Sequence, residues 1–469
     1  MSSQEDQPTS ALWRDIVDSI KGRPRDYTKG ALGRAILLLA IPMVLEMSMQ
    51  SLFSVVDVYF VSRLGTTPVA IVTLTEAVLM IVFALAIGFS MGTTAMVARR
   101  VGEGDPAAAS RVALQAILVG IGIAALVAVI GVTGPRFFLK LMGGSPELVQ
   151  EGSLFFAIIF GGNVTIVLLF LINAIFRGAG DPALAMRALW LANIVNMILD
   201  PILIFGLGPI PAFGLEGAAI ATTIGRGLGV SYQLWVLLTG RSKIQLDRNN
   251  LGIDPAVMKR LIRISAIGIL QFLVSTASFL FLAKIMSRFG DAALAGHTLA
   301  IRLITFVLLP VWGVGNAAAT LVGQNLGAGN PERAERSVWI TGFVNMCILG
   351  SVALVFIFMP ERVVGLFPVT QEVAALASSC LRIMAYSYVF WAYGMTTVMA
   401  FNGAGDTTTP TWINFFVYWV LQLPLAWYLG VTLGYGPQGV FAAVAVCQVV
   451  LAGVGVLVFR RGKWKTRAV

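Results

Sequence analysis

The stretch "AILLLAIPMVLEMSMQSLFSVVDVYFVS", residues 35–62, decides the fold class of this chain. An α-helix needs about 20 mostly apolar residues to cross roughly 30 Å of hydrocarbon, and this stretch is longer than that. Its apolar residues are continuous rather than alternating, which indicates a membrane-spanning helix and argues against a strand of an outer-membrane barrel. Pro42 lies inside the stretch and permits a kink, because proline lacks the N–H that a helical hydrogen bond requires.

The composition of the whole chain agrees with this start. Of its 469 residues, 57% are hydrophobic and only 12% are charged, and the mean hydropathy is +0.85. Soluble domains have roughly 45–50% apolar and 25% charged residues, so an integral membrane protein is expected. We predict an all-α membrane protein with twelve transmembrane helices, at about 35–62, 69–98, 112–133, 150–176, 183–207, 214–239, 257–287, 292–322, 335–359, 372–401, 409–433 and 437–459.

The formal net charge of +10 raises the question of a nucleic-acid partner, and the positions of the basic residues answer it. When the 33 Lys and Arg residues are assigned to alternate sides of the twelve spans, 24 fall on the side of the N-terminus, five on the opposite side and four inside spans. This asymmetry is the positive-inside pattern. It predicts a multi-pass protein of the cytoplasmic (inner) membrane with both termini in the cytoplasm, and no nucleic-acid partner.

An internal repeat predicts the architecture. Three motifs return at a constant offset of 225 residues: "VSRLG" (61–65) as "MSRFG" (286–290), "GEGDP" (102–106) as "GAGNP" (327–331), and "RGAGDP" (177–182) as "NGAGDT" (402–407). Each repeat holds six spans, an even number, so both repeats enter the membrane in the same orientation. We expect two six-helix lobes related by a pseudo-twofold along the membrane normal, with a substrate cavity between them.

The segments between and around the lobes are polar. The N-terminal segment has no apolar core after a basic start, so no signal peptide is expected. We expect Asp181 to cap a helix that begins at Pro182, and the three cysteines to be small buried apolar side chains. The chain divides into a cytoplasmic or surface N-terminal segment, an N-lobe, a cytoplasmic linker with a surface-lying helix, a C-lobe and a cytoplasmic basic tail: residues 1–33, 34–240, 241–256, 257–462 and 463–469.

Ionisable residues inside the spans are functional candidates, because each needs a partner or an aqueous cavity. In the first span Glu46, Gln50, Ser54 and Asp57 follow at steps of four, four and three, so they form one polar stripe. Together with the neighbouring Phe53, the first three are candidates to line a substrate cavity. In the fifth span Asn196 and Asp200 share a face in the same way. Six further ionisable residues lie within the predicted spans: Glu76, Arg226, Lys284, His297, Arg302 and Arg382. The three arginines are candidates to reach a membrane boundary with their long side chains, and His297 is expected to be packed or hydrogen-bonded rather than a proton carrier.

The two aspartates on different helices can form a proton site or an oxygen-lined site for a hard cation such as sodium. The alternative is structural. Asp200 precedes Pro201 and would cap or staple a helix, and Asp57 would pair with Lys284 or Arg63. Protons and sodium remain equally open at this point.

Several motifs resemble those of the multidrug and toxic compound extrusion (MATE) transporters: "SVVDVYFVSRLG", "VARRVGEGD", "NAIFRGAGDP", "NMILDPILIFGLG", "GLEGAAIAT" and "LVGQNLGAGN". The resemblance runs from about Arg34 to Gly462. It is greatest to the prokaryotic branch that includes the DNA-damage-inducible F and archaeal transporters. It implies a coupling site in the N-lobe at Asp57, Asn173, Asn196, Asp200 and Thr222.

The functional prediction is a secondary active efflux antiporter that exports organic, cationic or amphipathic compounds in exchange for H⁺ or Na⁺. It is expected to be a monomer in membrane lipid, with a small-molecule substrate, no cofactor and no metal beyond Na⁺ at the coupling site. The alternative is a flippase of lipid-linked oligosaccharides from the same superfamily, which would need a strongly basic cavity. An enzyme is not expected, because one histidine and scattered serines supply no catalytic constellation.

Overall fold

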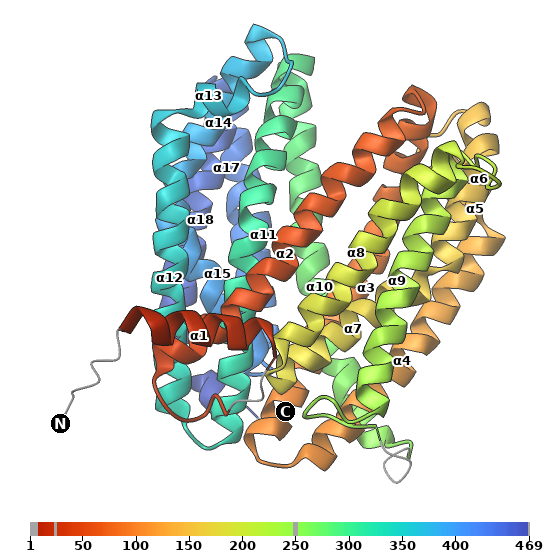
Figure 1. Cartoon of the computed structure of the whole chain (residues 1–469). Helices are drawn as coiled ribbons and strands as arrows, with labels where there is room; N and C mark the ends of the chain where they lie inside the picture. The colour runs from red at the N-terminus through yellow and green to blue at the C-terminus, as the bar shows by residue number, and fades with distance from the viewer. Residues whose placement is uncertain (1–7, 23–25, 247–251, 468–469) are drawn as a thin grey trace.

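The structure is a computed structural model that describes residues 8–22, 26–246 and 252–467. Two bundles of long helices approach each other at the end where both termini lie and diverge toward the opposite end (Figure 1). Among the described residues the pairing typical of strands is confined to one bridge between Leu207 and Ile210. The predicted all-α class is therefore confirmed.

The N-lobe is built from the first half of the chain, and its helices enclose two apolar clusters. Gly162 interrupts the fourth predicted span, so that this span consists of two helices. The helices are α2 (Leu32–Ser62), α3 (Thr66–Gly102), α4 (Pro106–Thr133), α5 (Pro135–Leu141), α6 (Pro146–Gly161), α7 (Asn163–Ala179), α8 (Pro182–Phe205) and α9 (Leu215–Leu238).

The C-lobe repeats this arrangement with two irregular spans. Its tenth span is bent by 64° between α14 and α15. In its eleventh span π-helical segments at Phe416–Gln422 and Tyr428–Thr432 flank the short helix that contains Pro424. The helices are α10 (Pro255–Met286), α11 (Asp291–Gly327), α12 (Pro331–Phe358), α13 (Pro360–Val364), α14 (Gln371–Ala385), α15 (Tyr388–Gly403), α16 (Thr408–Phe415), α17 (Leu423–Trp427) and α18 (Gly436–Arg460).

The number of spans agrees closely with the sequence. Within the described part of the chain, ten helices are long and apolar enough to cross a membrane, or eleven when the bent pair α14 and α15 counts as one span. The sixth predicted span, at about 214–239, corresponds to α9, which is helical over 24 residues but does not reach the same apolarity. Apolar side chains such as Leu126, Leu280 and Leu457 are exposed on the outside of the bundles, as expected for a surface in contact with lipid.

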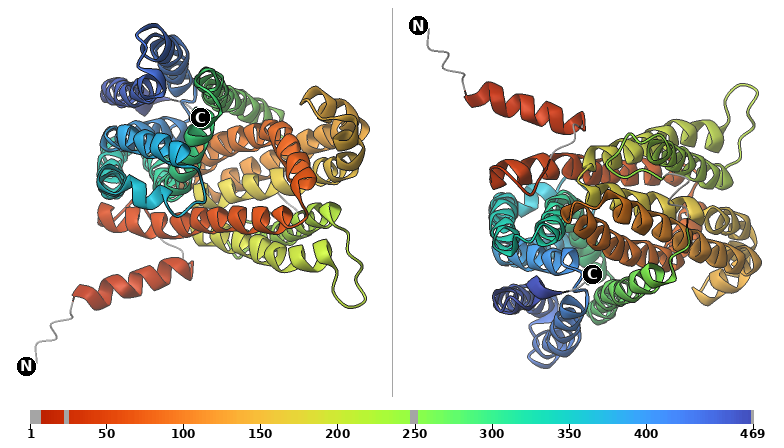
Figure 2. Two further views of the ribbon diagram at one scale, coloured as in Figure 1. Left: turned by 90° about the horizontal axis from the view of Figure 1, so that it is seen from above. Right: turned by 90° about the horizontal axis from the view of Figure 1, so that it is seen from below.

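Helix α2 connects the two bundles. Its first half packs on α11 of the C-lobe, with Leu39 and Met43 against Val314 and Ala317, and its second half packs on α8 of the N-lobe. The close approach of α2 to α11 requires Gly313, because a Cβ at this position would lie 2.7 Å from the carbonyl oxygen of Met43. Figure 2 shows the resulting arrangement, with α2 in red and orange running along both bundles.

The N-terminal segment lies across the end of the bundles that carries both termini. Helix α1 (Pro8–Ile20) packs on α2, and an ion pair of 2.5 Å joins Asp15 to Arg34. Arg333 of α12 donates to the backbone carbonyls of Tyr27, Lys29 and Gly30. These bonds connect the N-terminal segment to the C-lobe.

Three local expectations need correction. Asp181 precedes Pro182 as expected, but its carboxylate does not cap α8; it accepts hydrogen bonds from the Ser242 hydroxyl and the Lys243 backbone. Residues 257–263 are part of α10, which begins at Pro255, so they do not form a separate surface helix. Residues 247–251 of the linker lie outside the described residues. Cys347 is exposed, whereas Cys380 and Cys447 are buried as expected, and all three are free.

Candidate functional site

The polar stripe predicted on α2 runs along two cavities. Glu46 and Gln50 line a cavity of about 250 Å³ between the lobes, which we call the interlobe cavity. Gln50, Ser54 and Asp57 line a second cavity of about 320 Å³ inside the N-lobe, which we call the N-lobe cavity. Gln50 contributes to both, so one helix carries polar groups from one cavity to the other.

The N-lobe cavity collects charged residues from three helices. Asp57 of α2, Glu76 of α3 and Arg226 of α9 line it, together with Phe53 and Thr222. Arg226 is therefore the cation that shares a cavity with Asp57, rather than Lys284 or Arg63. The guanidinium of Arg63 instead contacts the hydroxyl and the ring of Tyr59.

Asp200 lies next to this cavity on α8. Its side chain is fully buried, and neither carboxylate oxygen has a hydrogen-bond partner among the described residues. One turn earlier, Asn196 donates a 3.0 Å hydrogen bond to the hydroxyl of Thr222. Thr222 and Asp57 line the same cavity, so the bond from Asn196 directs the face of α8 that carries Asn196 and Asp200 toward the cavity that contains Asp57. Two adjacent carboxylates with amide and hydroxyl oxygens can bind a proton or a hard cation.

The interlobe cavity contains a second polar cluster, centred on Glu46. One oxygen of this buried carboxylate accepts hydrogen bonds of 2.9 Å from both Asn173 and Arg177 of α7. Asn173 in turn accepts a 2.6 Å hydrogen bond from Gln233 of α9. The other oxygen of Glu46 has no hydrogen-bond partner among the described residues, and Glu46 lines the cavity.

The five residues implied by the family resemblance therefore fall into two groups. Asp57, Asn196, Asp200 and Thr222 gather in or beside the N-lobe cavity, whereas Asn173 belongs to the Glu46 cluster. Sequence reasoning missed Arg177, which it counted among the basic residues outside the spans. Arg177 is in fact buried inside α7. Its spacing of four residues from Asn173 was the available signal, because residues so spaced share a helix face.

The other ionisable residues within the spans have separate surroundings. Arg226 faces the N-lobe cavity rather than the membrane boundary. His297 is buried and stacks on Phe441 with ring centroids 6.0 Å apart, which is the packed role considered for it. Arg382 forms an exposed 2.6 Å ion pair with Glu361 near the end of α12. Groups of three or more His, Cys, Asp or Glu that could hold a metal ion do not occur among the described residues.

Comparison with known proteins supports a relationship over nearly the whole chain. The protein-family model MatE matches residues 42–202 and 268–428, more than half of the chain, with one match in each lobe. A probable multidrug resistance protein NorM from Thermotoga maritima is 27% identical over 443 residues, which cover 93% of this chain and 94% of that protein. An FAD transporter from Shewanella oneidensis is 25% identical over 398 residues, 84% of this chain and 87% of that protein.

Solved structures agree with these sequence relationships. A crystal structure described as MATE in the straight conformation superposes with a TM-score of 0.88 at 26% sequence identity. The match covers 94% of this chain and 98% of that chain. The similarity therefore includes both bundles and not a single lobe.

Proposed function

This chain belongs to the MatE family, and from that premise we propose that it is a secondary active efflux antiporter. In this proposal it exports organic compounds, cationic or amphipathic, in exchange for H⁺ or Na⁺. It works as a monomer in the cytoplasmic membrane with both termini in the cytoplasm, and it needs no cofactor beyond the coupling ion. The relatives named as multidrug resistance proteins support the export of organic compounds.

The observation that carries the proposal is the buried, unpartnered carboxylate of Asp200 on the face of α8 that bonds Thr222, beside the cavity that Asp57 lines. Two carboxylates that share a site repel each other when both are ionised. Binding of a proton or a sodium ion removes that repulsion. The site therefore has a built-in affinity for a monovalent cation, with the oxygens of Asn196 and Thr222 close by.

Coupling to the substrate follows from the course of α2. Asp57 lies toward one end of this helix, and Glu46 and Gln50 lie along it at the interlobe cavity. Pro42 precedes them, next to the close contact between Met43 and Gly313 of the C-lobe. A change of charge at Asp57 that bends α2 at Pro42 would therefore alter both the lining of the interlobe cavity and the packing between the lobes.

The direction of transport rests on the arrangement of the bundles. They converge at the end that carries both termini and diverge at the other end (Figure 1). The surplus of Lys and Arg on the terminal side favours the cytoplasm for the converging end. In this orientation the bundles diverge toward the exterior, so the space between them opens outward. This conformation suits the release of substrate to the exterior.

The flippase alternative receives less support from the cavities. A carrier of anionic lipid-linked sugars needs an excess of basic residues around its substrate. In the interlobe cavity Arg177 is already paired with Glu46, and the N-lobe cavity contains Asp57 and Glu76 with Arg226. These linings favour a substrate that is not strongly anionic.

Transport by the purified protein in proteoliposomes tests the proposal. Substrate-dependent movement of a cationic dye is measured under an imposed pH gradient and, separately, under an imposed sodium gradient. The proposal predicts transport driven by at least one gradient and collapse of that transport when an ionophore dissipates the gradient. Transport that ignores both gradients would refute antiport.

A further inference from the structure

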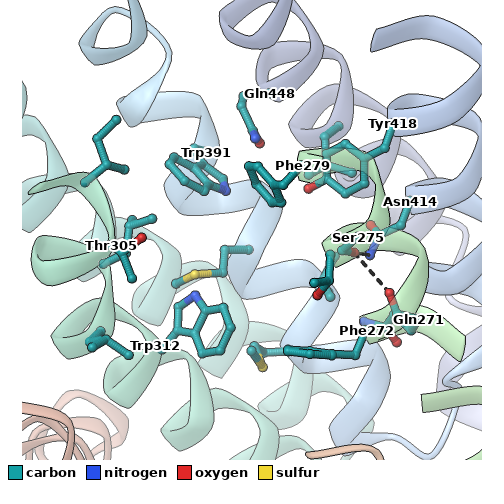
Figure 3. Close-up of a pocket in the computed structure, with 18 of the residues that line it drawn as sticks. Gln271, Phe272, Ser275, Phe279, Thr305, Trp312, Trp391, Asn414, Tyr418 and Gln448 are labelled. Carbon is teal, nitrogen blue, oxygen red and sulfur yellow. Dashed lines mark hydrogen bonds between the residues drawn. The ribbon is translucent and has the colours of Figure 1, made fainter. Parts of the chain in front are cut away.

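The space between the lobes extends from the interlobe cavity into the C-lobe. A cavity of about 350 Å³ lies there, with Trp312 and Trp391 in its lining (Figure 3). This cavity and the interlobe cavity have lining residues in common, so they are parts of one interlobe space: Met91, Phe272, Leu309, Trp312 and Met399. In the proposed antiport this space opens at either end in turn. The contacts that close one end therefore influence the whole cycle.

Helices α3 and α11 cross at the converging end of the bundles, and their contact follows the internal repeat. At the offset of 225 residues, Gly102 of α3 corresponds to Gly327 of α11, and Arg99 corresponds to Gln324. A Cβ at Gly102 would overlap the backbone carbonyl of Gln324. A Cβ at Gly327 would overlap the backbone carbonyl of Arg99 in the same way. Each glycine therefore lets the backbone of the other lobe approach closely.

The side chains of the two equivalent residues Arg99 and Gln324 join the lobes by different routes. Gln324 of the C-lobe donates a 2.9 Å hydrogen bond directly to the backbone carbonyl of Gly178, at the end of α7 in the N-lobe. Arg99 of the N-lobe instead donates from its guanidinium to the backbone carbonyl of Arg467. Arg467 belongs to the C-terminal tail, by which we mean the described residues 463–467 that follow α18.

An aromatic contact fixes the C-terminal tail to the C-lobe. Trp464 is buried and stacks on Phe459 of α18 with ring centroids 4.6 Å apart. Its indole N–H donates a 2.9 Å hydrogen bond to the backbone carbonyl of Phe459. Phe459 in turn meets the edge of Trp339 of α12, with centroids 5.5 Å apart. Because buried tryptophans contribute a large apolar area, the tail is expected to move with the C-lobe as one body.

Two ion pairs hold the rest of the C-terminal tail on the same lobe. Lys465 forms a 2.6 Å ion pair with Glu335 of α12, and Arg467 forms a 3.2 Å ion pair with Asp406, whose carboxylate is buried. At the offset of 225 residues, Asp406 corresponds to Asp181, which holds the linker that follows the N-lobe. The tail therefore docks on the C-lobe as the linker docks on the N-lobe.

We propose that the C-terminal tail is a latch that holds the two lobes together at the cytoplasmic end and stabilises the outward-open arrangement. Opening toward the cytoplasm moves α3 of the N-lobe away from α11 and from the tail. The bond between Arg99 and Arg467 must then break, while the bonds of the tail to the C-lobe stay intact. The meaning of the latch for transport rests on the proposed antiport. Its effect on opening does not, and it can be measured without any gradient.

A single cysteine in the interlobe space can report which end is open. Asn316 lines the interlobe cavity, so the reporter is Asn316→Cys in a chain whose three native cysteines are replaced by alanine. A membrane-impermeant maleimide is added from the cytoplasmic side in inside-out vesicles and from the outer side in right-side-out vesicles. The labelling rate from each side measures the fraction of molecules that is open to that side.

Arg99→Met removes the donor and leaves the C-terminal tail anchored. We expect it to raise the labelling rate from the cytoplasmic side by about threefold, the scale of one partly exposed hydrogen bond, without raising the rate from the outer side. Deletion of the chain after Gly462 should give the same increase, and the combination should add nothing, because both changes remove one bond. Arg111→Met is the matched control, because Arg111 is an exposed arginine of α4 without a hydrogen bond or ion pair among the described residues.

Several results would overturn the latch. They are an unchanged cytoplasmic labelling rate in Arg99→Met, an equal increase in Arg111→Met, or increases that multiply when Arg99→Met and the deletion are combined. Faster labelling from both sides would also overturn it, because that result indicates a loosened fold rather than a shift between two states. Labelling as expected in a protein that transports under neither gradient would leave the latch standing and remove the antiport proposal, so the two failures are distinguishable.

Discussion

Arg177 of α7 forms a 2.9 Å ion pair with Glu46 of α2, and both side chains are shielded from solvent, with exposed fractions of 10% and 1%. If one of the two charged side chains is removed, water cannot reach the other to solvate its charge. Breaking a buried pair from one side is more damaging than removing both charges together. The pair therefore fixes the part of α2 that lines the interlobe cavity.

Removing only the cation of this pair should destabilise the protein. For Arg177→Met we expect a loss of about 3–5 kcal/mol, because Glu46 is left as an uncompensated buried charge. The double variant Glu46→Gln with Arg177→Met should recover part of that loss. Thermal unfolding of the detergent-solubilised protein measures both effects as shifts of the midpoint.

The exposed ion pair between Arg382 and Glu361 is the control for this comparison. Its side chains are 42% and 63% exposed, so Glu361→Gln should change stability by about 0–1 kcal/mol. A loss as large as that of Arg177→Met would show that burial does not determine the effect. Equal stability of Arg177→Met and the double variant would likewise contradict the account.

Thr222 should matter for the coupling ion through its hydroxyl. Thr222→Val removes the acceptor of the 3.0 Å bond from Asn196, and we expect a higher cation concentration for half-maximal transport, by about tenfold. Thr223→Val is the matched control on the next residue, because the Thr223 hydroxyl donates only to the Ala219 carbonyl of its own helix. Dye efflux measured against cation concentration distinguishes them. Equal shifts in both variants would remove Thr222 from the site.

The contact between α2 and α11 should not tolerate a larger side chain. A Cβ at Gly313 would lie 2.7 Å from the Met43 carbonyl, so Gly313→Val forces the lobes apart at a packing cost of about 1–3 kcal/mol. We expect little transport from this variant in proteoliposomes. Gly122→Val in α4 is the control, because a Cβ there has no atom within 4 Å. Normal transport by Gly313→Val would mean that this contact plays no part in the cycle.

Features that depend on the periodicity of the sequence could be predicted from the sequence alone. The steps of four and three residues from Glu46 to Asp57 predicted one polar face on α2, and the structure has these residues along adjacent cavities. The constant repeat offset predicted two lobes. Both patterns are set by helix geometry within a single segment, and such geometry can be read without knowledge of tertiary packing.

Features that depend on packing between helices could not be predicted in the same way. Arg177 was placed just outside the fourth span, which was predicted to end at residue 176, yet it lies within α7, where it pairs with Glu46 of another helix. Asn173 was grouped with Asp200 by family resemblance, but its hydrogen bonds join it to Glu46 and Gln233. The 64° bend between α14 and α15 has no proline at the break and was also missed.

The central claim is that Asp57 and Asp200 share one exchangeable cation. It is tested most directly by the initial rate of gradient-driven dye transport in proteoliposomes for Asp57→Asn, Asp200→Asn and the double variant. We expect each single change to lower the rate by at least about tenfold, and the double change to add little, because residues that act on one ion are not additive. Full activity in either single variant, or losses that multiply in the double variant, would contradict a shared site.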